Sequence, residues 1–136
     1  MPAILSFRRT HNYSLSNREG IQVPVELEFN GRAVRLLAKV DTGASFCIFQ
    51  RAYAEQLGIA VESGQRTVVS TANSSFDVYG HEVTVSCFEW QFSLTVYFPK
   101  NEIRRNVLGR AGWLQNFRVA IIDHDSLLHI SHYNDL

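Results

Sequence analysis

The sequence has little that would place the protein in a membrane or outside the cell. It contains only two cysteines, Cys47 and Cys87, so a disulfide scaffold is excluded and two buried free thiols in a reducing compartment are expected. No apolar run is long enough to cross a bilayer. The charges within residues 1–16 leave no apolar core for a secretory signal. We therefore expect a cytoplasmic protein without a membrane partner, and the initial Met suggests a complete small chain.

The sequence also lacks an excess of either charge. Thirteen Lys and Arg balance thirteen Asp and Glu, which provides no electrostatic basis for binding nucleic acid. The pair Arg104-Arg105 is too short a basic run to change this expectation. Net neutrality leaves self-association unopposed by long-range repulsion. With 136 residues, 46% of them hydrophobic, the chain is long enough for one domain.

The patterning that is present predicts a mainly β fold. Apolar residues alternate over 21–29 and 32–40, and Asn30-Gly31 between them is a strong signal for a two-residue hairpin turn. Two short helices are expected, one over 48–58 and one within 107–117. Residues 1–20 lack a clear period and are predicted to form an N-terminal arm, with 21–136 as a single domain. Further strands are expected at 66–71, 76–88, 91–98, 118–123 and 127–131.

One acid interrupts this pattern in a chemically suggestive way. Asp41 ends an apolar strand and is followed by a small hydroxyl residue, Thr42, then by Gly43 and Ala44, which leave space around the carboxylate. If two such loops meet tip to tip, two carboxylates about 3 Å apart cannot both ionise and must share a proton. Such a pair can activate water and protonate a carbonyl, which is general acid–base hydrolysis of a peptide bond.

These residues carry a resemblance to a known family. The segment "VDTGAS" resembles the active-site signature of aspartic proteases. The segment "NVLGRAGWLQNF", residues 106–117, resembles the strand and following helix of retropepsin-like proteases, and the ending "FRVAIIDHDSLLHI" resembles the paired strands after that helix. The likeness covers residues 21–131. It implies a retropepsin-like fold, a closed β-barrel-like lobe with two short helices.

The resemblance also implies where a catalytic partner would come from. Pepsin-like enzymes carry two Asp-Thr/Ser-Gly motifs, whereas retropepsin-like ones carry one and dimerise. This chain has one, so a homodimer is expected, with Asp41, Thr42 and Gly43 of both chains forming the catalytic centre on a peptide or protein substrate. No cofactor and no metal are implied. Structural support would come from Val107, Leu108, Gly109 and Arg110.

In this family a hairpin folds over the substrate as a flap, and residues 68–83 would correspond to it. Its tip would include Ala72, Asn73 and Ser74, which would contact substrate although the tip contains no glycine. Ala44 and Lys39 are also expected beside the substrate. For Lys39 a second interpretation stays open, a solvated lysine whose stem covers apolar surface.

Other kinds of site have weaker support. Residues 123–135 collect three aspartates and three histidines, but their spacing matches no known metal site. No Gly-x-Ser-x-Gly motif indicates a serine hydrolase, and Cys47 is expected in the core. The alternative to an aspartic endopeptidase is a catalytically inactive dimer of the same fold that binds peptides or other proteins.

Overall fold

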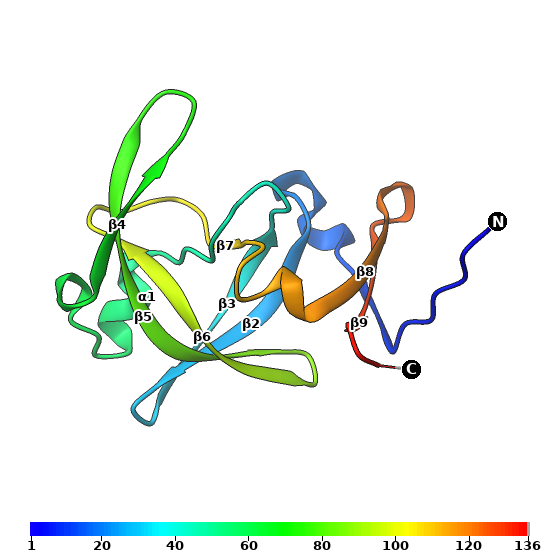
Figure 1. Ribbon diagram of the computed structural model, residues 1–136, viewed down its shortest axis with the longest axis horizontal. Coiled ribbons are helices and arrows are strands. Elements are labelled where there is room, and N and C mark those ends of the chain that lie inside the picture. The colour runs from blue at the N-terminus through cyan, green and yellow to red at the C-terminus, as the bar shows by residue number, and fades with distance from the viewer. Residues whose placement is uncertain (136) are drawn as a thin grey trace.

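The computed structural model describes residues 1–135 as a mainly β protein with two sheets (Figure 1). A six-stranded sheet has the order β4-β5-β2-β3-β7, with β6 paired to β5, and a three-stranded sheet has the order β1-β9-β8. The strands are β1 (Arg9–Asn12), β2 (Gln22–Phe29), β3 (Arg32–Val40), β4 (Gln65–Ser70), β5 (Ser75–Cys87), β6 (Trp90–Pro99), β7 (Val107–Leu108), β8 (Phe117–Ile122) and β9 (Leu127–His132).

Helical structure is confined to short segments. The α-helix α1 is accompanied by 3₁₀ segments of three to six residues. Within residues 1–135 no helix has the length and apolarity to traverse a bilayer. The helical segments are α1 (Arg51–Gln56), η1 (Ser14–Glu19), η2 (Val61–Ser63), η3 (Leu114–Asn116) and η4 (Asp123–Asp125).

The β2–β3 hairpin confirms the alternation found in the sequence. Val23, Val25 and Leu27 are buried on one face of β2, and the turn closes at Asn30-Gly31. Both turn residues have positive φ, 47° and 82°, which is the geometry that a two-residue turn between twisted strands requires. One apolar core runs through both sheets, and its largest fully buried side chains are Trp113, Phe49, Phe98, Leu27, Leu57, Leu108, Leu128 and Ile130.

Three details differ from the sequence-based expectations. The two sheets resemble a barrel-like lobe but do not close into a true barrel. The second expected helix is only the 3₁₀ turn η3, because Gly112 with φ 90° interrupts helical geometry just before it. Residues 1–20, in which no strand was expected, contain β1, which pairs along its whole length with β9. This long-range pairing leaves no periodic signal in so short a strand.

Tyr13 fastens this N-terminal segment to the turn between β8 and β9. Its side chain is buried, its hydroxyl donates a hydrogen bond to the Asp123 carboxylate, and its backbone N–H donates to Ser126 O at 3.0 Å. Burial, reinforced by the neighbouring Asp123, raises the pKa of Tyr13 to about 12. The folded protein therefore holds the phenolic proton at pH values where the unfolded chain has lost it.

We predict that Tyr13→Phe lowers the free energy of unfolding by about 1 kcal/mol at neutral pH, because a hydrogen bond is lost. The contribution of Tyr13 is present below pH 10 and disappears as the pH rises toward about 12, so the variant should lose less stability over that interval. Urea unfolding at several pH values measures both effects. Tyr133→Phe, at an exposed tyrosine, is the control, and identical pH profiles for all three proteins would contradict the assignment.

Candidate active site

Asp41 lies at the first position after β3, held by its own backbone. Its N–H donates to Leu108 O at 3.0 Å, and its carbonyl accepts from the Ala44 N–H at 3.2 Å. The Gly43 N–H donates to Asp41 Oδ1 at 2.9 Å, which orients the carboxylate. Asp41 is half-buried, whereas Thr42 and Gly43 are exposed. The loop therefore presents an oriented carboxylate at the surface of a single chain.

The short strand β7 lies inside this loop. One edge of β7 pairs in parallel with β3, and the other edge pairs with Ile48 as the chain returns. Ile48 and Val107 exchange two backbone hydrogen bonds, of 2.9 and 2.7 Å. Beyond β7, the Arg110 N–H donates to Ala44 O at 2.8 Å. Both ends of the loop that carries Asp41 are thus hydrogen-bonded to β7, and the middle of the loop is bonded to the residues that follow β7.

Gly109 is where the two segments approach most closely. A Cβ atom at this buried position would lie 2.3 Å from Phe46 O and 2.8 Å from Ala44 O, both of them backbone atoms that cannot rotate away. Only glycine fits this crossing without moving the loop. The structure therefore brings Val107, Leu108 and Gly109 against the Asp41 loop. Arg110 joins them only through its main chain, since its exposed side chain forms no ion pair or hydrogen bond within residues 1–135.

Asn106 is a supporting residue that the sequence did not reveal. Its Oδ1 accepts from the Gln50 N–H at 2.9 Å, and its Nδ2 donates to Leu37 O at 3.3 Å. The side chain thereby connects β3 to the start of α1 immediately before β7. In the sequence, Asn106 is distinguished only by its position just before Val107–Gly109. That position does not predict which backbone groups its side chain would contact.

The β4–β5 hairpin projects away from the body of the protein (Figure 1). Thr71 and Ser74 close its tip, with the Thr71 N–H donating to Ser74 O at 2.7 Å and the Ser74 N–H donating to Thr71 Oγ1 at 3.2 Å. No tip residue has a positive φ, so this turn forms without glycine. Ala72 and Asn73, between Thr71 and Ser74, are exposed. The hydrogen bonds of the tip join Thr71 to Ser74, and none of them reaches Asp41.

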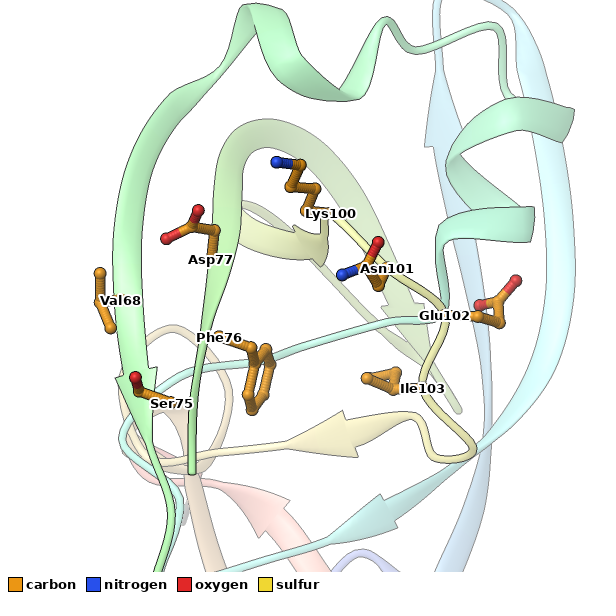
Figure 2. A pocket seen from close by; sticks show the side chains of 8 residues that line it. All are labelled: Val68, Ser75, Phe76, Asp77, Lys100, Asn101, Glu102 and Ile103. Atoms are coloured by element: carbon orange, nitrogen blue, oxygen red, sulfur yellow. The ribbon is translucent and has the colours of Figure 1, made fainter. Parts of the chain in front are cut away.

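A pocket opens beside the half of this hairpin nearer its tip, facing the connection between β6 and β7 (Figure 2). Figure 2 shows the side chains of Phe76, from β5, and Ile103, from the connection, opposite each other, with Asp77 and Lys100 nearby. Asp77 forms an ion pair with Arg66 at 3.4 Å. Apolar and polar side chains therefore line the pocket together.

Other candidate sites contribute no catalytic group. Both thiols are buried, and burial raises the pKa of Cys47 to about 11 and that of Cys87 to about 12, so neither is a ready nucleophile. Within residues 1–135, no three His, Cys, Asp or Glu side chains gather closely enough to hold a metal ion, and this includes the acidic and histidine-rich segment 123–135.

Comparison with known proteins places this geometry in a family. A family model described as "Aspartyl protease" matches residues 25–111. No curated protein matches the sequence. A retropepsin-like aspartic protease from Rickettsia conorii is similar in structure, with a TM-score of 0.62 and 23% identity over 85% of this chain and 92% of that one.

Two further solved structures share the fold. The EIAV protease in complex with the inhibitor HBY-793 has a TM-score of 0.55 and 17% identity over 74% of this chain and 88% of its own. The retroviral protease-like domain of Ddi1 from Leishmania major has a TM-score of 0.52 and 20% identity over 85% of this chain and 98% of its own. The fold is therefore retropepsin-like, as the sequence predicted.

Gly109→Ala should displace the loop that carries Asp41. We expect a loss of about 1–3 kcal/mol in the free energy of unfolding, because a Cβ cannot be accommodated at the crossing. Gly43→Ala is the matched control, since a Cβ there would meet only Asp41 Oδ1 at an ordinary 3.4 Å. Denaturant unfolding of both variants measures the difference, and equal stability of the two variants would contradict a tight crossing at Gly109.

Proposed function

Because the chain belongs to the aspartyl protease family, we propose that it is an endopeptidase whose catalytic dyad forms from the Asp41 side chains of two copies. The proposal rests on how a single chain holds Asp41. Backbone hydrogen bonds hold Asp41 firmly, yet the next two residues, Thr42 and Gly43, are exposed to solvent. A rigid, exposed tip of small residues suits close contact with an identical tip across a two-fold axis.

The remaining aspartates support a partner from a second chain. Each of them already has a partner elsewhere in the fold, so none is free to complete a dyad with Asp41. The pairs are Asp77 with Arg66, Asp123 with Tyr13, Asp125 with His124, and Asp135 with Arg8.

In the proposed mechanism one Asp41 carboxylate accepts a proton from water while the other, protonated, donates to the carbonyl oxygen of the peptide bond. As it loses that proton, the water oxygen bonds to the carbonyl carbon and a tetrahedral diol forms. The C–N bond then breaks: the first carboxyl gives its proton to the leaving amine nitrogen, and the second takes a proton from a diol hydroxyl as the new carboxyl group forms. The reaction needs no covalent intermediate with the protein. The Gly43 N–H keeps the carboxylate in place throughout, and the Thr42 hydroxyl would bond across the axis to hold the two loops together.

Substrate would lie in an extended form between the dyad and the β4–β5 hairpins acting as flaps. Ala44, Lys39 and the tip residues Ala72, Asn73 and Ser74 would contact it. The absence of glycine from the tip slightly favours the alternative, an inactive, peptide-binding dimer. The Thr71–Ser74 turn weakens that reason, because it closes without any left-handed residue. We also propose a cytoplasmic location, where Cys47 and Cys87 would stay reduced.

Asp41→Asn tests the assignment of the acid. We expect cleavage of unfolded test proteins to fall about 100-fold or more, because an amide cannot take a proton from water. Stability and oligomeric state should be unchanged, since the amide oxygen can still accept from the Gly43 N–H. Asp125→Asn is the matched control, at an aspartate that pairs with His124. Residual activity equal to wild type would sink the assignment.

A mixing experiment tests whether two chains supply the dyad. When a fixed amount of wild type exchanges with an equal amount of Asp41→Asn, random pairing should reduce cleavage to about half, because mixed dimers lack one carboxylate. A catalyst built from one chain would keep its full activity in the mixture. Activity is measured at a concentration well above that at which dimers dissociate, and analytical ultracentrifugation establishes that concentration.

A further inference from the structure

A groove with an excess of positive charge runs beside the strand that delivers Asp41. Its walls come from β3, from the end of η1 and from the connection that precedes β7, and its volume is about 860 Å³. That size accommodates several side chains of a bound peptide. The charged residues that line it are Arg18, Glu19, Lys39, Arg104 and Arg105.

Four cations in this groove face a single carboxylate, in a protein whose formal net charge is zero. None of the four forms an ion pair with another part of the chain within residues 1–135. Several other arginines of the protein are neutralised by carboxylates, namely Arg8, Arg35, Arg51 and Arg66. The groove is therefore a local concentration of uncompensated positive charge, and it would attract an anionic group.

The position of Lys39 connects this groove to the proposed dyad. Lys39 precedes Asp41 by two residues, a distance of about 7 Å along a strand, on the same side of the chain. Its N–H donates to Asn106 O at 2.8 Å, which fixes the backbone at this point. Its stem lies against Gly20, where a Cβ would come within 2.9 Å of Lys39 Cε. The ammonium group is thus carried on a supported stem, close to where a peptide bond would be cut.

From this arrangement we infer that the groove selects peptide segments with Asp or Glu one or two residues from the cleaved bond. The inference rests on the proposed function, because it places the peptide over Asp41. In a two-fold dimer each half of the substrate would meet one copy of the groove, so acidic residues would be favoured on both sides of the bond. Exposed Leu37 and half-buried Tyr53 provide apolar surface for the stem of a glutamate.

Single-stranded nucleic acid is the other polyanion that such a groove could attract. Its non-specific recognition usually combines positive charge with aromatic side chains on which bases stack. Tyr53 is the one aromatic residue that lines the groove among residues 1–135, and it is half-buried. The structure therefore favours an acidic peptide.

The test measures binding separately from cleavage. Asp41→Asn protein is titrated with a labelled peptide that carries Glu on both sides of a central apolar pair, and with the same peptide carrying Gln, using fluorescence anisotropy. We expect the Glu peptide to bind about fivefold more tightly, as exposed ion pairs provide, and the preference to shrink with added salt. Adding Lys39→Met and Arg105→Gln should remove the preference. Adding Arg35→Gln, at a paired arginine outside the groove, should not change it.

Two binding results would overturn the inference: equal affinity for both peptides, or tighter binding of a single-stranded oligonucleotide than of the Glu peptide. The proposed function is judged by other data. If wild type cleaves Glu and Gln peptides equally well, the groove assignment fails and the protease assignment stands. If the Glu peptide binds selectively and wild type cleaves neither peptide, the protease assignment fails and the groove assignment stands.

Discussion

The crossing of Gly109 beneath the Asp41 loop is the constraint on which the site depends. β7 contains only two residues, but β3 occupies one of its edges and the returning segment at Ile48 occupies the other. The loop between these two flanks cannot move independently, because its backbone bonds to the same short strand on both sides. Absence of a side chain at Gly109 permits this closeness. Main-chain hydrogen bonds, rather than neighbouring charges, thus fix the position of the Asp41 carboxylate.

Within residues 1–135, a single chain holds the Asp41 carboxylate in place but supplies no second carboxylate beside it. The hydrogen-bonded loop holds Thr42 and Gly43 at an exposed position. The other aspartates form contacts elsewhere in the chain. In the proposed dimer, each chain would supply one half of an acid–base pair. Association would therefore complete the site, and it would need little rearrangement of the loop, since the backbone is already held.

Two hollows lie near the site, a pocket beside the β4–β5 hairpin and a positively charged groove beside β3. In the proposed enzyme, the β4–β5 hairpin and the pocket beside it would offer polar and apolar contacts to an extended substrate segment. The groove beside β3 offers cations from three separate parts of the chain. Overall neutrality conceals this groove, because its excess of positive charge is offset by carboxylates elsewhere in the chain. Local charge, rather than the total, would decide which segments the proposed enzyme prefers.

The sequence alone determined the features that depend on neighbours in the chain. Alternation predicted β2 and β3, Asn30-Gly31 predicted their turn, and the Asp-Thr-Gly motif predicted an acid at the end of a strand. These could be predicted because side-chain direction and turn geometry repeat over a few residues. The retropepsin-like fold followed from motifs at two distant points, residues 40–45 and 106–117.

The tertiary structure alone decided whatever depends on residues far apart in sequence. The pairing of β1 with β9 gives order to a segment that has no period of its own. The hydrogen bonds of Asn106 and the convergence of Arg18, Lys39 and Arg105 join segments that no local pattern relates. Long-range backbone pairing and the charges that it brings together emerge only when the whole chain is packed, because each segment's partner is chosen by the rest of the fold.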